Sequence, residues 1–204
     1  MPPSVVQVSN TDRADEAMTR YARGDATAFD VVYDAVAPRL VRYVSRHVRD
    51  RARQEDLIQQ TFLHMHAARG TFTTGAAVMP WAYAIARRLM IDAERRDRRE
   101  PVLERDDDRL LTAGGSVAEG ESPASAEQLL EAEQANARLT AAYALLSARQ
   151  RAAFELVKDE GLPYAQAAAV LGTTVTGIKL RVHRATLALR EALGPAEASR
   201  SKVA

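Results

Sequence analysis

The sequence predicts an all-α protein of two small helical domains joined by an acidic flexible linker, the second domain containing a helix-turn-helix. Apolar residues recur at three- and four-residue intervals through most of the chain. No segment alternates with period two for long enough to predict a strand. Between residues 100 and 124 large apolar residues become scarce and acids accumulate. Such a composition is typical of a solvated linker.

The composition excludes several classes of protein. A chain of 204 residues, 47% of them hydrophobic, is long enough for one large domain or two small ones. No apolar run approaches the roughly 20 residues that span a bilayer, and we expect neither membrane insertion nor a secretory signal. No cysteine is present, which excludes disulfides, thiolate zinc sites and cysteine nucleophiles and favours a cytoplasmic protein.

The net charge of +1 conceals a strong segregation of charge along the chain. Residues 87–99 contain six arginines and three acids, whereas residues 100–131 contain nine acids and two arginines. This pattern predicts a surface that binds a polyanion, followed by a solvated connector. The alternative is that arginine simply replaces lysine throughout the chain.

The first domain is expected over residues 12–99, after a disordered N-terminus over residues 1–11. Its helices are predicted at residues 12–22, 26–48, 54–69 and 80–99. Asp25 can cap the second helix, and Pro38 should bend or break it because proline lacks an N–H.

The third helix is expected to have Glu55 and Asp56 in its first turn, where carboxylates suit the helix dipole. Its inward-facing residues are predicted to be Leu57, Ile58, Thr61, Phe62 and Met65. Residues 70–79 contain two glycines and no charge, and are predicted to form a loop. Pro80 suits the first position of the fourth helix, whose predicted inward residues are Trp81, Ile85 and Leu89.

The second domain is expected over residues 125–194, with the linker over 100–124 before it and a disordered tail over 195–204 after it. Two capping boxes mark helix starts in this domain, formed by Ser125 with Gln128 and by Ser147 with Gln150. The second of these helices should extend to Gly161.

Residues 163–193 are predicted to form the helix-turn-helix. Gly172 follows the first, alanine-rich helix where a left-handed residue is needed, and Thr174 can cap the second helix. The apolar face of that second helix is formed by Ile178, Val182, Ala185 and Leu189. Its other face is basic, which favours DNA reading; the alternative is an ordinary helical hairpin with a solvated charged face.

Two distant stretches resemble one family. EDLIQQTFLHMHAA (55–68), followed by PWAYAIARRLMIDAERR (80–96), resembles the second conserved region of bacterial sigma factors of the extracytoplasmic-function group. LLSARQRAAFELVKDEGLPYAQAAAVLGTTVTGIKLRVHRA (145–185) resembles their fourth region. The resemblance implies a region-two-like domain over 12–99 and a region-four-like domain over 125–194. It therefore implies core RNA polymerase and promoter DNA as partners.

The resemblance assigns roles to particular residues in the first domain. Docking on the coiled coil of the polymerase's largest subunit would involve Asp56, Gln59, Gln60 and Phe62, with Gln60 standing where the family usually has an acid. Contacts with the minus-ten element would involve Thr71, Phe72, Thr73, Thr74, Arg87, Arg88, Arg95 and Arg96. Melting requires a pocket for an extruded base and cations along the strand. Trp81 invites a stacking role, but its place on the apolar face favours core packing.

In the second domain the resemblance places the recognition helix in the major groove of the minus-thirty-five element. Its DNA-contacting candidates are Thr176, Lys179, Leu180, Arg181, His183 and Arg184. Leu180 stands where a small polar residue is usual, and Gln166 where an acid is usual. Leu180 is interpreted either as a contact to a thymine methyl or as a buried packing residue.

Two other classes of protein fit the sequence less well. An enzyme is disfavoured because His64 and His66 face different directions on one helix, and no phosphate-binding glycine loop or metalloprotease motif is present; no cofactor or metal is expected. A helix-turn-helix regulator that acts without polymerase leaves the first-domain motifs unexplained. Family members are often held inactive by an anti-sigma factor, so the resemblance implies such a partner as well.

Overall fold

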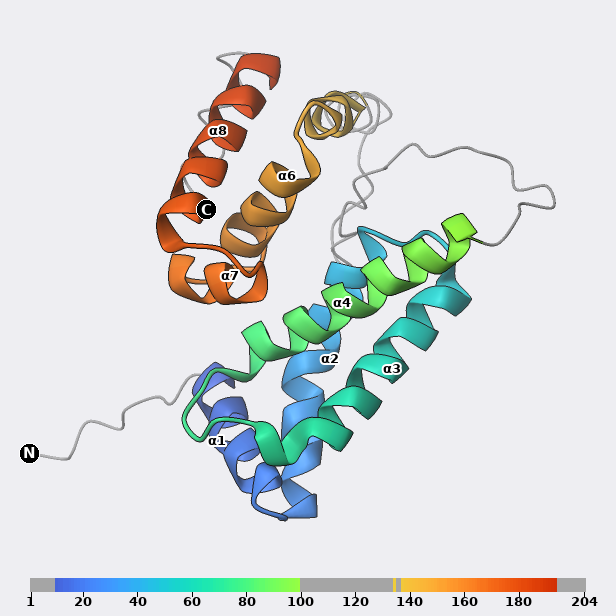
Figure 1. The fold of residues 1–204 in the computed structure, drawn as a ribbon, viewed down its shortest axis with the longest axis vertical. Coiled ribbons are helices and arrows are strands. Elements are labelled where there is room, and N and C mark those ends of the chain that lie inside the picture. The colour runs from blue at the N-terminus through green and yellow to red at the C-terminus, as the bar shows by residue number, and fades with distance from the viewer. Residues whose placement is uncertain (1–9, 100–133, 135–136, 194–204) are drawn as a thin grey trace, which may run out of the picture. The chain divides into compact units, whose positions relative to one another are not determined.

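The computed structural model describes residues 10–99, 134 and 137–193, and over these residues the chain forms helices and turns without a strand (Figure 1). The all-α prediction is therefore confirmed. The chain divides into two compact units, residues 1–105 and 106–204, which are considered separately below. Residues 10 and 11 were predicted to be disordered but are helical. The expectations for residues 1–9, the linker, the Ser125 capping box and the C-terminal tail lie outside the described residues.

The first unit consists of helices that pack around a shared core. In chain order they are α1 (Asn10–Ala22), η1 (Ala26–Ala28), α2 (Phe29–Ser45), α3 (Arg51–Ala68), η2 (Arg69–Thr71) and α4 (Val78–Arg99). In Figure 1, α3 and α4 run side by side, and both also contact α2.

Local capping explains where these helices begin. The Asp25 carboxylate accepts hydrogen bonds from the N–H and the hydroxyl of Thr27, so the predicted cap is confirmed, although a 3-10 turn precedes α2. Asp50 accepts from the N–H groups of Ala52 and Arg53, which starts α3 three residues earlier than predicted. The expectation that Glu55 and Asp56 occupy the first turn is therefore wrong.

Two further expectations in this unit are corrected, the first in part. Pro38 does not break helix α2, which continues to Ser45. Pro38 has no N–H to donate to the Asp34 carbonyl, and both residues are exposed. Helix α4 begins at Val78, so Pro80 is its third residue rather than its first.

The core of the first unit is assembled from all four α-helices. Its largest fully buried side chains include Met18, Leu40, Tyr43, Met65 and Tyr83, and the rings of Tyr43 and Tyr83 lie 5.0 Å apart. On α4 the buried positions are Val78, Met79, Ala82, Tyr83, Ala86 and Ala93. The predicted inward residues Trp81, Ile85 and Leu89 are only partly buried, because small alanines allow α4 to approach its neighbours most closely on the adjacent face.

The second unit contains a helix over residues 137–144, then α6 (Ala148–Phe154), η3 (Glu155–Asp159), α7 (Tyr164–Val170) and α8 (Val175–Leu193). The capping box of Ser147 and Gln150 is confirmed in both directions. The helix that follows widens into a π-helical turn at η3, where the Glu160 N–H donates to the Glu155 carbonyl at 2.9 Å, and it ends before Gly161.

The helix-turn-helix is confirmed residue by residue. Gly172 has φ +58°, a conformation that costs glycine little, and Thr174 Oγ1 accepts from the Gly177 N–H at 3.0 Å. The predicted inward residues of α8 are all buried; they are Ile178, Val182, Ala185 and Leu189. The last two also pack against the helix over residues 137–144, which holds the C-terminal half of α8.

Candidate functional site

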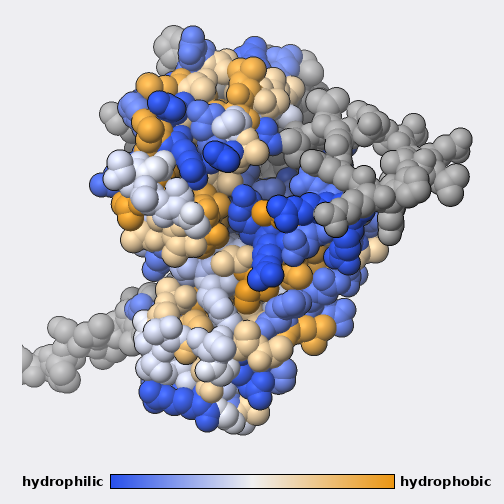
Figure 2. All heavy atoms as spheres, in the orientation of Figure 1, coloured by the Kyte–Doolittle hydropathy of each residue, from blue (hydrophilic) through white to orange (hydrophobic). Residues whose placement is uncertain are grey.

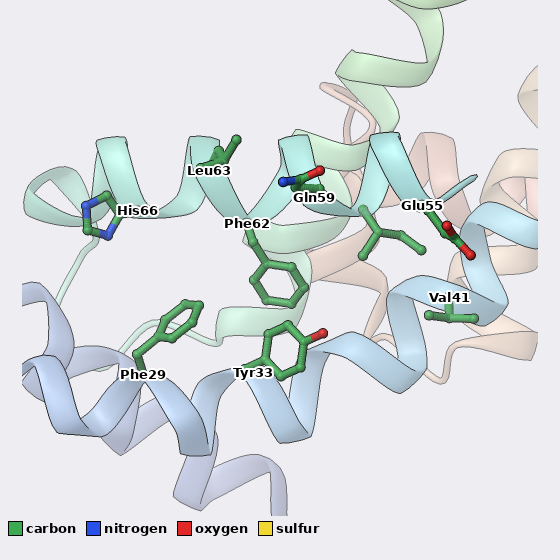
Figure 3. Close-up of a pocket in the computed structure, with 9 residues that line it drawn as sticks. Phe29, Tyr33, Val41, Glu55, Gln59, Phe62, Leu63 and His66 are labelled. Carbon is green, nitrogen blue, oxygen red and sulfur yellow. The ribbon is translucent and has the colours of Figure 1, made fainter. Parts of the chain in front are cut away.

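A groove runs between α2 and α3 of the first unit. Its volume is about 450 Å³, and its lining residues are Phe29, Tyr33, Val41, Glu55, Ile58, Gln59, Phe62, Leu63 and His66. The rings of Phe29, Tyr33 and Phe62 point toward one another between the two helices (Figure 3). Phe62 lies 4.7 Å from Tyr33 and 6.1 Å from Phe29, measured between ring centroids, and forms the floor of the groove.

The rim of this groove exposes large apolar side chains to solvent. Tyr33, Val41 and Leu63 are 45%, 46% and 58% exposed. Glu55 and Gln59 add polar groups to the same lining, and Glu55 pairs with Arg51 at 3.2 Å. Exposed apolar residues that gather at one concave surface, with polar groups beside them, are typical of an interaction site.

The structure divides the predicted core-binding residues into two adjacent sets. Gln59 and Phe62 line the groove, but Phe62 is only 7% exposed. Asp56 is exposed next to the groove, and Gln60 donates a hydrogen bond to its Oδ2 at 2.8 Å. Gln60 therefore holds the one carboxylate of this set in place, although it adds no charge of its own.

Sequence reasoning missed the apolar rim. Tyr33, Val41 and Leu63 were not singled out, because helical periodicity alone does not show which apolar side chains remain exposed. The available signal was Leu63, a large apolar residue that directly follows the inward-facing Phe62 and so must lie on a different side of the helix.

The loop between η2 and α4 presents threonines to solvent. Thr71, the last residue of η2, and Thr73 and Thr74 in the loop itself are exposed, so these three predicted minus-ten residues are accessible. Phe72 differs: it is 9% exposed, and its ring lies 5.1 Å from that of Trp81. Both aromatic rings thus support the loop from beneath, which agrees with the interpretation of Trp81 as a packing residue.

Helix α1 anchors this loop through two side chains. Asp15 Oδ1 accepts from the Val78 N–H at 2.8 Å, and Thr19 Oγ1 accepts from the Gly75 N–H at 3.4 Å. Burial raises the pKa of the Asp15 carboxyl above its ordinary value of 3.8; the Val78 hydrogen bond lowers it in part, and the nearby Asp12 raises it further. By contrast, the hydrogen bond from the Thr27 side chain lowers the pKa of Asp25.

These two carboxyl groups should titrate in a defined order. A pH titration followed by carboxyl carbon NMR is expected to give Asp15 a pKa above 3.8 and Asp25 a pKa below it. Asp15 binds its proton more tightly in the folded than in the unfolded chain, so its contribution to stability grows as pH falls through its folded pKa. Asp25 has the opposite sign: its contribution is complete above its ordinary pKa and is lost as pH falls through the lower folded value. The reverse order of the two pKa values would contradict this assignment.

The arginines of α4 form a cationic surface. Arg88, Arg95 and Arg96 are exposed and Arg87 is half-buried, and Figure 2 shows hydrophilic side chains gathered around the C-terminal half of this helix. Asp92 pairs with Arg88 at 3.8 Å and with Arg95 at 3.9 Å. Exposed ion pairs of this kind contribute little, so these guanidinium groups can exchange Asp92 for a phosphate at small cost.

Helix α8 presents its predicted DNA-reading residues on one side of the second unit. Exposed residues here are Thr176, Lys179, Leu180, His183 and Arg184, and Arg181 is half-buried. Leu180 is 48% exposed, so the interpretation of this side chain as a buried packing residue is wrong. Its exposed methyl groups remain available to contact a base.

Within the described ranges, no group of three or more His, Cys, Asp or Glu residues could hold a metal ion. Nor does any helix in the described part of the chain have the length and apolar character needed to cross a membrane.

Comparison with known proteins identifies the class of both units. Residues 32–100 match the sequence model of Sigma-70 region 2, and residues 136–189 match that of Sigma-70, region 4. The chain therefore has the two DNA- and polymerase-binding regions of a sigma factor, in their usual order. It belongs to the extracytoplasmic-function (ECF) RNA polymerase sigma factors, a family of DNA-binding initiation factors rather than catalytic enzymes.

Individual relatives align along most of their length. RNA polymerase sigma factor CarQ of Myxococcus xanthus is 31% identical over 180 residues, which cover 88% of this chain and 97% of the relative. ECF RNA polymerase sigma factor SigF of Caulobacter vibrioides is 30% identical over 186 residues, covering 91% and 96%.

Two solved structures share the fold. The sigma factor RpoE of Bartonella quintana, in complex with the anti-sigma factor NepR, superposes with a TM-score of 0.59 at 27% identity, covering 81% of this chain and 96% of that one. CnrH, in complex with the cytosolic domain of CnrY, superposes with a TM-score of 0.61 at 21% identity, covering 88% and 97%.

Proposed function

We propose that this chain is an alternative sigma factor whose first unit binds core RNA polymerase and melts the minus-ten element, and whose second unit reads the minus-thirty-five element. The observation that supports this division is that each unit exposes a different surface suited to its role. The first has an apolar groove beside a carboxylate and a cationic helix, and the second has a cationic recognition helix on a helix-turn-helix.

Reconstitution with core RNA polymerase tests the proposal. The purified chain should be retained by core enzyme and should direct transcription from promoters selected from a randomised DNA pool. A helix-turn-helix regulator would instead bind DNA without polymerase and leave the start sites of core enzyme unchanged. That result would reject the proposal that this chain acts as a sigma factor.

The docking surface for polymerase is proposed to be the α2–α3 groove together with Asp56. A helix of the partner's coiled coil can place apolar side chains against Tyr33, Val41 and Leu63. Asp56 can then accept charge-assisted hydrogen bonds from arginines of the same helix. Phe62 supports this surface from its floor.

The minus-ten strand is proposed to lie across residues 71–77, here called the threonine loop, and the cationic side of α4. Thr71, Thr73 and Thr74 supply hydroxyl groups next to an extruded base, and Arg88, Arg95 and Arg96 lie along the phosphates.

The minus-thirty-five element is proposed to be read by Thr176, Lys179, Leu180 and Arg181, with His183 and Arg184 on phosphates. Alanine at Lys179 or Arg181 is expected to cost about 1–3 kcal/mol at one base position and to relax preference there. Binding to a panel of single-substitution duplexes would measure this effect. Arg190→Ala, on the last turn of the same helix, is the matched control for loss of one exposed charge. An equal loss on every duplex would instead assign the side chain to phosphate.

We also propose an anti-sigma factor as a regulatory partner. The support is that the sigma factor RpoE of Bartonella quintana, whose fold this chain shares, was captured in complex with the anti-sigma factor NepR. Cytoplasmic location follows from the proposed work on promoter DNA, and the proposal involves no catalytic residue, cofactor or metal.

A further inference from the structure

The loop that follows η2 is buried at both ends and exposed in the middle. Phe72 at one end is 9% exposed and Val78 at the other is fully buried, whereas Thr73, Thr74 and Gly75 are exposed between them. Gly75 has φ +78°, and the Ala76 N–H donates to the Thr73 carbonyl at 3.0 Å, which closes a turn. This segment has no charged residue and little conformational preference of its own, so its shape depends on support from elsewhere.

That support comes from α1, far away in sequence. Asp15 and Thr19 are four residues apart and therefore lie on the same face of the helix. Thr19 Oγ1 accepts from Gly75 at 3.4 Å and its hydroxyl donates to the Asp15 carbonyl at 3.0 Å, which orients the oxygen toward the loop. Asp15 Oδ1 accepts from the N–H of Val78 at 2.8 Å.

We propose that Asp15 and Thr19 are positioning residues that fix the threonine loop for single-stranded promoter DNA, an inference that rests on the proposed function of this loop. Val78 is the first residue of α4, so its N–H has no acceptor within that helix. By accepting from it, Asp15 fixes where the loop ends and the cationic helix begins. Thr19 fixes the loop at its turn.

The consequence for DNA binding is preorganisation. A loop already in its bound shape loses less conformational freedom when a strand binds. Without the α1 anchors the exposed threonines would sample several arrangements, and both affinity for the strand and discrimination among bases would fall. The helix-turn-helix in the other unit would be unaffected.

The anchors can be tested in the free full-length chain by hydrogen exchange of single amides. Asp15→Ala should speed exchange at Val78, whereas Asp15→Asn, which keeps an acceptor oxygen, should not. Thr19→Val, which removes the hydroxyl at constant shape, should speed exchange at Gly75. Glu16→Ala removes an exposed carboxylate from the same helix and should leave both amides unchanged.

The functional effect is measured in holoenzyme with two DNA probes. One is a forked duplex whose single-stranded segment comes from a promoter that the wild-type holoenzyme selects from a random pool; the other is the upstream duplex alone. Asp15→Ala and Thr19→Val should weaken binding to the fork about tenfold, within the range found for loss of a helix cap, and flatten its base preference. Binding to the upstream duplex should be unchanged, and Asp15→Asn should restore fork binding.

The possible failures differ from one another. If the Val78 amide loses protection but fork binding and base preference stay as in wild type, the positioning role is overturned while the sigma-factor assignment stands. If Asn rescues no better than Ala, the hydrogen bond is not the cause. If the wild-type holoenzyme itself shows no base preference in the single strand, the proposed function of the loop fails and this inference fails with it.

Discussion

Replacement of Asp56 by arginine is expected to abolish binding to core RNA polymerase while the helical fold stays intact. Asp56 is exposed beside the α2–α3 groove, and its carboxylate is oriented by Gln60. In the proposed complex, charge reversal would place like charge against the partner's arginines and leave them without an acceptor. Such changes typically cost roughly 2–5 kcal/mol, or about 30-fold to several thousand-fold in affinity.

A second variant and a control separate docking from folding. Leu63→Asp places a charge at the exposed apolar rim and should also weaken core binding strongly, without loss of a buried contact within the chain. Glu16→Arg makes the same charge change as Asp56→Arg on the exposed side of α1 and should bind core enzyme like wild type. Biolayer interferometry against immobilised core enzyme gives the affinities, and circular dichroism confirms the fold. Wild-type affinity of both folded groove variants would reject this docking surface.

Local signals in the sequence were sufficient for the helix-turn-helix. The turn at Gly172, the cap at Thr174 and the apolar residues at helical spacing depend only on neighbours a few positions away. The sequence pattern and the structure therefore agree. The start of α3 was missed for a local reason too: Asp50 caps it, although Glu55 and Asp56 look like the acids of a first turn. On α4 the helical period of apolar residues was predicted, but the most buried face was not. Large residues such as Trp81 were expected on that face, whereas the helix packs most closely through its alanines.

Among the residues of the candidate sites, the charged ones stand out in the sequence, whereas the apolar rim of the groove, unlike Phe62 at its floor, does not. Asp56 and the α4 arginines stand out as charges within motifs. The groove instead requires Tyr33 and Val41 from one helix and Leu63 from another, and periodicity cannot distinguish an apolar side chain that is covered from one that is exposed. The anchor of the loop is still less accessible from sequence, because Asp15 and Val78 are 63 positions apart and meet only when α1 packs beside α4.

Removal of Arg95 and Arg96 together is expected to impair promoter melting but not recognition of the upstream element. Both side chains are exposed, and their interactions with Asp92, a 3.9 Å ion pair and a 3.4 Å hydrogen bond to its carbonyl, are too weak for their loss to unfold α4. In the open complex each guanidinium would neutralise a phosphate of the separated strand. Loss of each such contact should lower the slope of log affinity against log salt by about 0.7.

Permanganate footprinting of holoenzyme on a selected promoter measures the melted bubble, and a filter-binding salt series on forked DNA measures the slope. The double alanine variant should show a weaker bubble and a slope reduced by about 1.4, twice the single-contact value for single strands. Binding to the isolated upstream duplex should match wild type, because that element is proposed to be read by α8. Arg13→Ala with Arg23→Ala removes two exposed arginines from the α1 end of the same unit and should leave the bubble unchanged. A bubble and a slope equal to wild type in the Arg95 and Arg96 variant would remove the minus-ten assignment from α4, and would leave promoter reading to the helix-turn-helix alone.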